Sequence, residues 1–141
     1  MRVTTAFLCD AATVREGLLH ALGAPISRIW RTPEQRDLHV YLAMLVAMEE
    51  QDYGIPHEIR ANLIGPNRPL GEVVGVFVMP KPDRLEPNEI LEIPQVLSLV
   101  GAPWEDYGCH TIEIFGDGHG PLIKTFYMLH PEEQVLPPIS D

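Results

Sequence analysis

Histidine is the residue type in this chain that most readily binds a metal ion or moves a proton near neutral pH. The chain has six histidines: His20, His39, His57, His110, His119 and His130. Their spacing forms no HExxH or HxH motif and no paired CxxC accompanies them. The sequence therefore predicts no metal and no cofactor. One alternative stays open, in which His57, His110 and a carboxylate converge in the fold and bind a small molecule or a metal, in a binding protein or an enzyme.

Nucleophilic and acid–base catalysis has equally little support. No serine lies in a G-x-S-x-G elbow; the three are Ser27, Ser98 and Ser140. The paired carboxylates are neighbours in sequence, so in a strand they point to opposite faces; they lie at 49–50, 105–106 and 132–133. The glycine-rich segment 116–120 lacks the lysine of a phosphate-binding loop. We therefore predict no catalytic residues and a protein that is not an enzyme.

Four residues are the best candidates for binding a partner: Trp30, Arg31, Trp104 and Tyr107. Trp, Tyr and Arg are enriched among the residues that dominate interface energies. Trp30 ends an apolar run, which favours the core. Trp104 follows Pro103 in a loop, which favours exposure, with a plug over one end of the domain as the alternative.

The composition is that of a globular, acidic protein. The chain has 141 residues, of which 45% are hydrophobic and 21% are charged, and its formal net charge is −10. Such a charge repels nucleic acid and anionic membrane surfaces. We expect one domain over residues 1–135 and a tail at 136–141.

The N-terminal segment predicts a cytoplasmic protein. Its apolar run is too short for a signal peptide and no small-residue cleavage site follows. The longest apolar run, at 40–48, is far shorter than the roughly 20 residues of a membrane-spanning helix. In the cytoplasm Cys9 and Cys109 are expected to be reduced thiols rather than a disulfide.

Short strands fit the spacing of the 14 prolines and 11 glycines better than long helices do. We predict strands at 2–9, 38–48, 57–63, 72–79, 90–100, 110–115 and 122–129. Segments 18–22 and 26–31 fit two short strands or one strand broken at a bend, with a short helix as the weaker alternative. A turn, or a single helical turn capped by Asp10, is expected at 10–13. Pro94 should place its strand at an edge or a bulge and make it irregular.

Two details of this prediction depend on turns. The apolar segment 38–48 fits a buried strand or a helix, and the turn at 53–56 favours a strand that forms a hairpin with 57–63. Segment 116–120 is the turn of a second hairpin. Together the segments predict an all-β fold, an antiparallel immunoglobulin-like β-sandwich of about seven to nine strands.

One stretch has the character of a family motif. Residues 7–23, FLCDAATVREGLLHALG, closing on Ile29-Trp30, resemble the opening of an uncharacterised family of short bacterial all-β proteins. The similarity continues at Gly54-x-x-His57-x-Ile59 and around His110, so it covers nearly the whole chain. The resemblance implies a β-sandwich and supplies no catalytic residue.

The sequence thus favours a non-enzymatic interaction or structural module of a bacterial cytosolic complex. A sandwich has edge strands that can accept another chain, so the expected partner is a second protein or another copy of this one. Neither nucleic acid nor membrane is expected as a partner.

Overall fold

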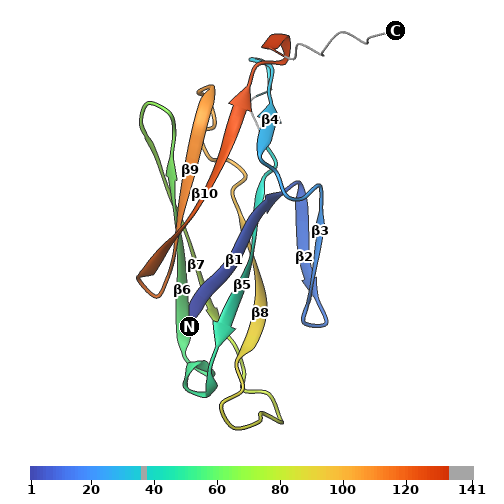
Figure 1. Cartoon of the computed structure of the whole chain (residues 1–141), viewed down its shortest axis with the longest axis vertical. Helices are drawn as coiled ribbons and strands as arrows, with labels where there is room; N and C mark the ends of the chain where they lie inside the picture. Colours follow the sequence, from blue (N-terminus) through green and yellow to red (C-terminus); the bar gives the residue numbers. More distant parts are fainter. Residues whose placement is uncertain (36–37, 134–141) are drawn as a thin grey trace, which may run out of the picture.

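The computed structural model describes residues 1–35 and 38–133 and shows an all-β protein (Figure 1). The strands are β1 (Arg2–Cys9), β2 (Ala11–Arg15), β3 (Leu18–Leu22), β4 (Arg28–Trp30), β5 (Tyr41–Met48), β6 (Pro56–Ile64), β7 (Pro69–Val78), β8 (Leu91–Ser98), β9 (Gly108–Gly116) and β10 (His119–Leu129). Within the described residues the helical elements are the 3-10 turns η1 (Glu50–Asp52) and η2 (Pro131–Glu133). The all-β prediction is confirmed, with ten strands rather than seven to nine. The predicted tail at 136–141 lies outside the described residues.

Two main sheets share one apolar core. One sheet has the order β1-β5-β8 and the other the order β4-β10-β9-β6-β7. Core residues come from both, including Leu42 and Met44 on β5, Ile59 on β6 and Ile112 on β9. The predicted antiparallel arrangement is wrong at one place, because β4 runs parallel to β10. β4 follows the β2–β3 hairpin in the chain and lies along the edge of β10, where both strands run in the same direction.

The ambiguous segment 38–48 contains a strand, β5, as predicted. Six of its eight residues are buried because β5 lies between β1 and β8 and faces the second sheet. The predicted hairpin of β5 with β6 is wrong, since both edges of β5 are already paired. The chain instead crosses through η1 to the other sheet, where β6 pairs with β7 and β9.

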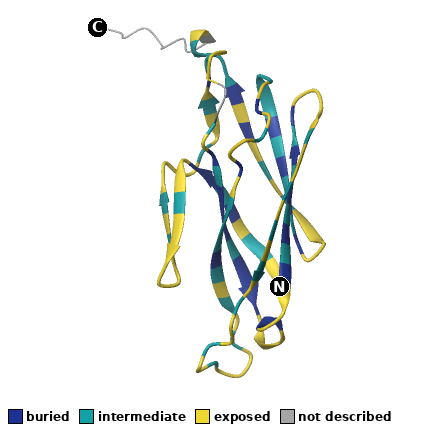
Figure 2. Cartoon of the chain, turned by 180° about the vertical axis from the view of Figure 1, so that it is seen from behind, coloured by how far each residue is buried: buried dark blue, intermediate teal, exposed yellow. Residues whose placement is uncertain are grey.

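The turn expected at residues 10–13 is wrong, since residues 11–15 form β2. Glu16 and Gly17, with φ of 53° and 74°, make a tight turn to β3. A Cβ on Gly23 would overlap the carboxylate of Asp10, whose N–H donates to the Leu22 carbonyl at 3.0 Å, so this contact closes the base of the hairpin. The hairpin stands beside the body as its own two-stranded sheet and has only exposed and half-buried residues (Figures 1 and 2).

The remaining two predictions concern β8 and the last hairpin. Pro94 does lie on an edge strand, because among residues 1–35 and 38–133 β8 pairs only with β5. The register is uninterrupted, so the predicted irregularity is wrong. β9 and β10 form the predicted hairpin, in which Asp117 and Gly118 have φ of 49° and 78°. Among the described residues no helix is long and apolar enough to cross a bilayer.

Candidate protein-binding edge

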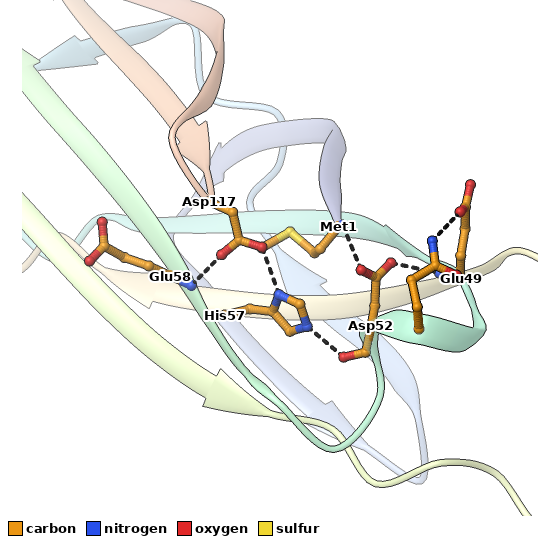
Figure 3. A network of polar contacts seen from close by, with 7 residues as sticks. Met1, Glu49, Asp52, His57, Glu58 and Asp117 are labelled. Carbon is orange, nitrogen blue, oxygen red and sulfur yellow. Dashed lines mark hydrogen bonds and ion pairs between the residues drawn. The ribbon is translucent and has the colours of Figure 1, made fainter.

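The polar group that most resembles a catalytic constellation is the His57 cluster, which consists of His57, Asp52 and Asp117 (Figure 3). His57 stands at the start of β6 and is 3% exposed. Its Nδ1 lies 2.7 Å from Oδ2 of Asp117 in the β9–β10 turn, and its Nε2 contacts the backbone carbonyl oxygen of Asp52. Both neighbours accept hydrogen bonds, so both ring nitrogens carry protons and His57 is an imidazolium.

The pKa values agree with this assignment. Burial opposes the charge on His57, but the Asp52 carbonyl and the Asp117 carboxylate outweigh it and raise the pKa of the ring. Burial likewise opposes ionisation of Asp117, yet the Glu58 N–H and His57 hold the pKa of that carboxyl below its ordinary value. A general base needs a free lone pair facing its substrate, and both nitrogens of His57 donate within the protein. The cluster therefore ties the β9–β10 turn to β6.

Asp52 extends the His57 cluster to the start of the chain (Figure 3). Its Oδ1 lies 3.0 Å from the amino group of Met1, and its Oδ2 accepts the N–H of Glu49 at 2.8 Å. Burial opposes ionisation, but these donors lower the pKa of Asp52. The Met1 side chain packs against Gly116, where a Cβ would lie 3.1 Å from its sulfur. Asp52 thus ties the start of the chain to η1 through its carboxylate and η1 to β6 through its backbone carbonyl.

The second buried histidine belongs to an aromatic cluster of Trp104, His110 and Phe126. The His110 ring is fully buried, stacks on Phe126 at 5.0 Å between centroids, and meets the edge of Trp104 at 5.6 Å. Its Nδ1 donates to the Gly108 carbonyl at 3.2 Å, which leaves Nε2 as an acceptor without a partner among the described residues. Burial lowers the pKa of His110, so this ring is neutral.

The two histidines do not converge, so the predicted meeting of His57 and His110 is wrong. His110 lies near the start of β9, whereas His57 contacts the turn that follows the end of β9. Within residues 1–35 and 38–133, no three or more His, Cys, Asp or Glu side chains gather as metal ligands would.

Trp104 and Trp30 have exchanged the environments that the sequence favoured for them. Trp104 is 2% exposed, packs against Phe126 and donates its indole N–H to the Leu99 carbonyl at 3.3 Å, so the alternative of a buried plug holds. Trp30 is 39% exposed on the short strand β4. A role for Trp30 in binding stays a prediction, and Trp104 has almost no surface to offer a partner.

Arg31 and Tyr107 bind each other and the backbone. The buried guanidinium of Arg31 donates to the carbonyls of Gln35 and Glu105 at 2.9 and 2.6 Å and lies 5.3 Å from the Tyr107 ring centroid. The Tyr107 hydroxyl donates to the Arg31 carbonyl at 2.9 Å. These contacts hold two loops together, and the binding role predicted for both residues remains a prediction.

The surface that stands out for binding is the free edge of β7. Within the part of the chain that the structure describes, this strand ends the five-stranded sheet and pairs only with β6. Val74, Val76 and Val78 on its outer face are 43%, 67% and 55% exposed. Edge strands are usually protected by lysine, proline or a bulge, yet β7 has no lysine and one charge, Glu72, and both its proline and its irregular pairing lie at its start, at residues 69–71. By contrast, the edge strand β8 carries Glu92 and Pro94.

Neighbouring hydrogen bonds show which backbone groups of β7 face outward. Glu58 accepts the Asp117 N–H and donates its own N–H to that carboxylate, both at 2.9 Å, so its groups point away from β7. Glu58 lies opposite Val76. In an antiparallel pair the bonded and non-bonded positions alternate, so Val76 directs its own N–H and C=O away from β6. Met79 lies three positions after Val76, so the alternation directs its carbonyl to the opposite side, toward β6. This carbonyl accepts the Gly54 N–H at 2.9 Å.

The inner face of β7 is held by the rest of the domain. Phe77 packs against the core and its ring lies 5.6 Å from that of His57. A Cβ on Gly75 would lie 3.2 Å from the Leu97 side chain of β8, so the edges of the two sheets lie side by side there. These contacts hold β7 in place. On its outward side, backbone N–H and C=O groups recur at every second residue. The sequence predicted a strand here, but strand order, and hence the free edge, cannot be read from a chain without its pairing.

Comparison with known proteins gives one match. The family model described as "Family of unknown function (DUF6941)" matches residues 4–127. No curated protein and no solved structure matches the chain.

Proposed function

We propose that this chain, which belongs to the Family of unknown function (DUF6941), is a non-catalytic protein-binding module of a bacterial cytosolic complex. An immunoglobulin-like β-sandwich is the architecture we propose for the family, with the two main sheets as its layers. In this proposal β7 is the binding element, and a strand of the partner adds to it.

The observation that carries the proposal is the outward side of β7. From Glu72 to Val78, alternate residues direct N–H and C=O groups away from β6, and three of those four residues are exposed valines. Backbone groups of this kind give affinity to an added strand, and the alternate side chains give specificity.

Exposure of the same valines has an energetic cost. Leaving apolar area in water forgoes about 25 cal/mol per Å², and an open apolar edge also invites aggregation. A partner strand would remove both disadvantages.

The two buried histidines need no ligand to explain their positions, because hydrogen bonds and aromatic contacts within the protein account for them.

The test is a pull-down from the native host with a tag placed after Asp141, because Asp52 engages the N-terminal amino group. Wild type is compared with Val76→Lys, which puts a charge on the exposed edge. Ile123→Lys is the matched control, since Ile123 is 56% exposed on β10, a strand of the same sheet that β9 and β6 separate from β7.

We expect wild type and I123K to capture the same chains in stoichiometric amount and V76K to lose them. Thermal melts of the three proteins should agree, which establishes that V76K is folded. Equal capture by V76K and wild type would contradict a binding role for this edge.

A further inference from the structure

We infer that the strand added to β7 is β7 of a second copy of this chain, paired antiparallel about a two-fold axis at Gly75. This inference rests on the proposed function and names its partner. It follows from the sequence of the edge, from the direction of its backbone groups and from the position of its one charge.

The edge is close to symmetric about Gly75. With Gly75 opposite its own copy, Val74 meets Val76 of the second copy and Val76 meets Val74, so each copy offers the surface that the other needs. A two-fold contact requires this kind of self-complementary patch. The outward-directed residues fall opposite each other in this register, which is where an antiparallel ladder forms its paired hydrogen bonds.

The charge of the edge fits the same register. Glu72 falls opposite Val78 of the second copy, so the two Glu72 carboxylates lie at opposite ends of the paired segment. Within its own copy Glu72 is already paired with Arg60 at 2.7 Å. Like charges directly opposite each other would oppose pairing, and this register avoids them.

Glycine suits the centre of the interface. Gly75 and its copy occupy a non-hydrogen-bonded position, where the two Cα atoms approach to about 4.5 Å. Because Gly75 has no side chain, its backbone can lie close to the Leu97 side chain on the inner face. On the outer face the valines of both copies form one apolar cluster across the axis.

The expected dimer is weak and responds to salt. A single strand pair lies at the small end of protein interfaces, so it should form reversibly as concentration rises. Each copy carries a formal charge of −10, and salt screens the repulsion between copies. Raising the ionic strength should therefore strengthen the dimer.

Sedimentation equilibrium of the full chain from about 1 to 500 µM tests the inference, a range that covers weak interfaces. Wild type and I123K should rise toward twice the monomer mass. Val76→Lys should raise the dimer Kd at least about tenfold. Val76→Pro should do the same without adding charge, because it removes a single outward N–H and leaves the bonds to β6 intact.

The outcomes separate the two proposals. A wild-type chain that stays monomeric over the whole range overturns the second-copy inference, while V76K-sensitive capture of a different protein would still support the binding function of β7. If V76K and V76P dimerise with the same Kd as wild type, the contact lies elsewhere and the inference is overturned. Loss in V76K with an unchanged dimer in V76P overturns strand pairing as the mode of contact.

Discussion

His57 and His110 have nearly the same burial and opposite charge. Their side chains belong to the five-stranded sheet, one at the start of β6 and the other near the start of β9, with exposures of 3% and 0%. The pKa of His57 is raised and that of His110 is lowered. Burial disfavours the charge at both sites. At His57 the Asp52 carbonyl and the Asp117 carboxylate outweigh it, whereas at His110 burial outweighs the single Gly108 carbonyl.

The surroundings of each ring show how this difference arises. His57 has an acceptor at each nitrogen, one of them a carboxylate, and joins segments 52, 57 and 117 through polar contacts. His110 has one carbonyl acceptor and is otherwise enclosed by Trp104 and Phe126. The first site is held by charge and the second by packing, so the two should respond differently to substitution and to pH.

Removing Phe126 should have the largest effect, because it empties the packed site. Phe126 is 1% exposed and contacts both other members of the aromatic cluster. We expect Phe126→Ala to lower the free energy of unfolding by about 3 to 5 kcal/mol. Urea denaturation measures this value. Tyr127→Ala is the control, since the neighbouring residue is 51% exposed and should cost about 1 kcal/mol or less.

Equal losses for the two Ala variants would contradict the packing of this site. Such a result would mean that the space left by Phe126 is filled by rearrangement or that Tyr127 contributes far more than its exposure indicates.

Removing the ring of His57 should have the next largest effect. Replacement by Leu leaves the Asp52 carbonyl and one oxygen of Asp117 without their donor. We expect His57→Leu to cost about 2 kcal/mol at pH 6, moderated because the Asp117 side chain is 32% exposed. Asp117→Asn keeps an acceptor in the turn and should cost about half as much. A D117N variant less stable than H57L would show that the carboxylate acts mainly on the turn rather than on His57.

The sequence could predict most of the strands but not these two sites. Alternation and glycine-containing turns located β1, β6 and the β9–β10 hairpin, because those signals are local. The β2–β3 hairpin was missed because its turn residues are Glu16 and Gly17, a weaker signal than Asn-Gly or Asp-Gly. The charge of His57 depends on Asp117, which is 60 residues away, and the exposure of Trp104 depends on which sheet end its loop covers. Such long-range contacts leave no periodic pattern.

The dependence of stability on pH should differ in sign between the two histidines. The raised pKa of His57 gives a stabilisation that is fully present below the unfolded-state value near 6.5 and is lost as the pH rises through the folded-state pKa. The lowered pKa of Asp117 gives a stabilisation present above its ordinary value of 3.8 and lost as the pH falls through its folded-state pKa. The advantage of wild type over H57L should therefore be greatest between these limits.

Urea titrations from pH 4 to 9 measure that advantage. It should shrink toward alkaline pH as His57 loses its proton. An advantage that stays constant from pH 6 to pH 9 would mean that the pKa of His57 is the same in the folded and unfolded protein, so that its contacts do not stabilise the charged ring.

The smallest effect at neutral pH should come from replacing His110 by Phe. The change keeps an aromatic ring against Phe126, gives up one hydrogen bond to Gly108 and removes the unpaired Nε2, so at pH 7.5 stability should change by about 1 kcal/mol or less. The pKa of His110 is lowered, so its contribution is present above about 6.5 and is lost as the pH falls through the folded-state pKa. His110→Phe should thus remove part of the acid destabilisation of wild type, whereas H57L should retain it. Identical acid limbs for wild type and H110F would show that the aromatic site tolerates a charged ring, and the contrast between the two histidines would then be one of position alone.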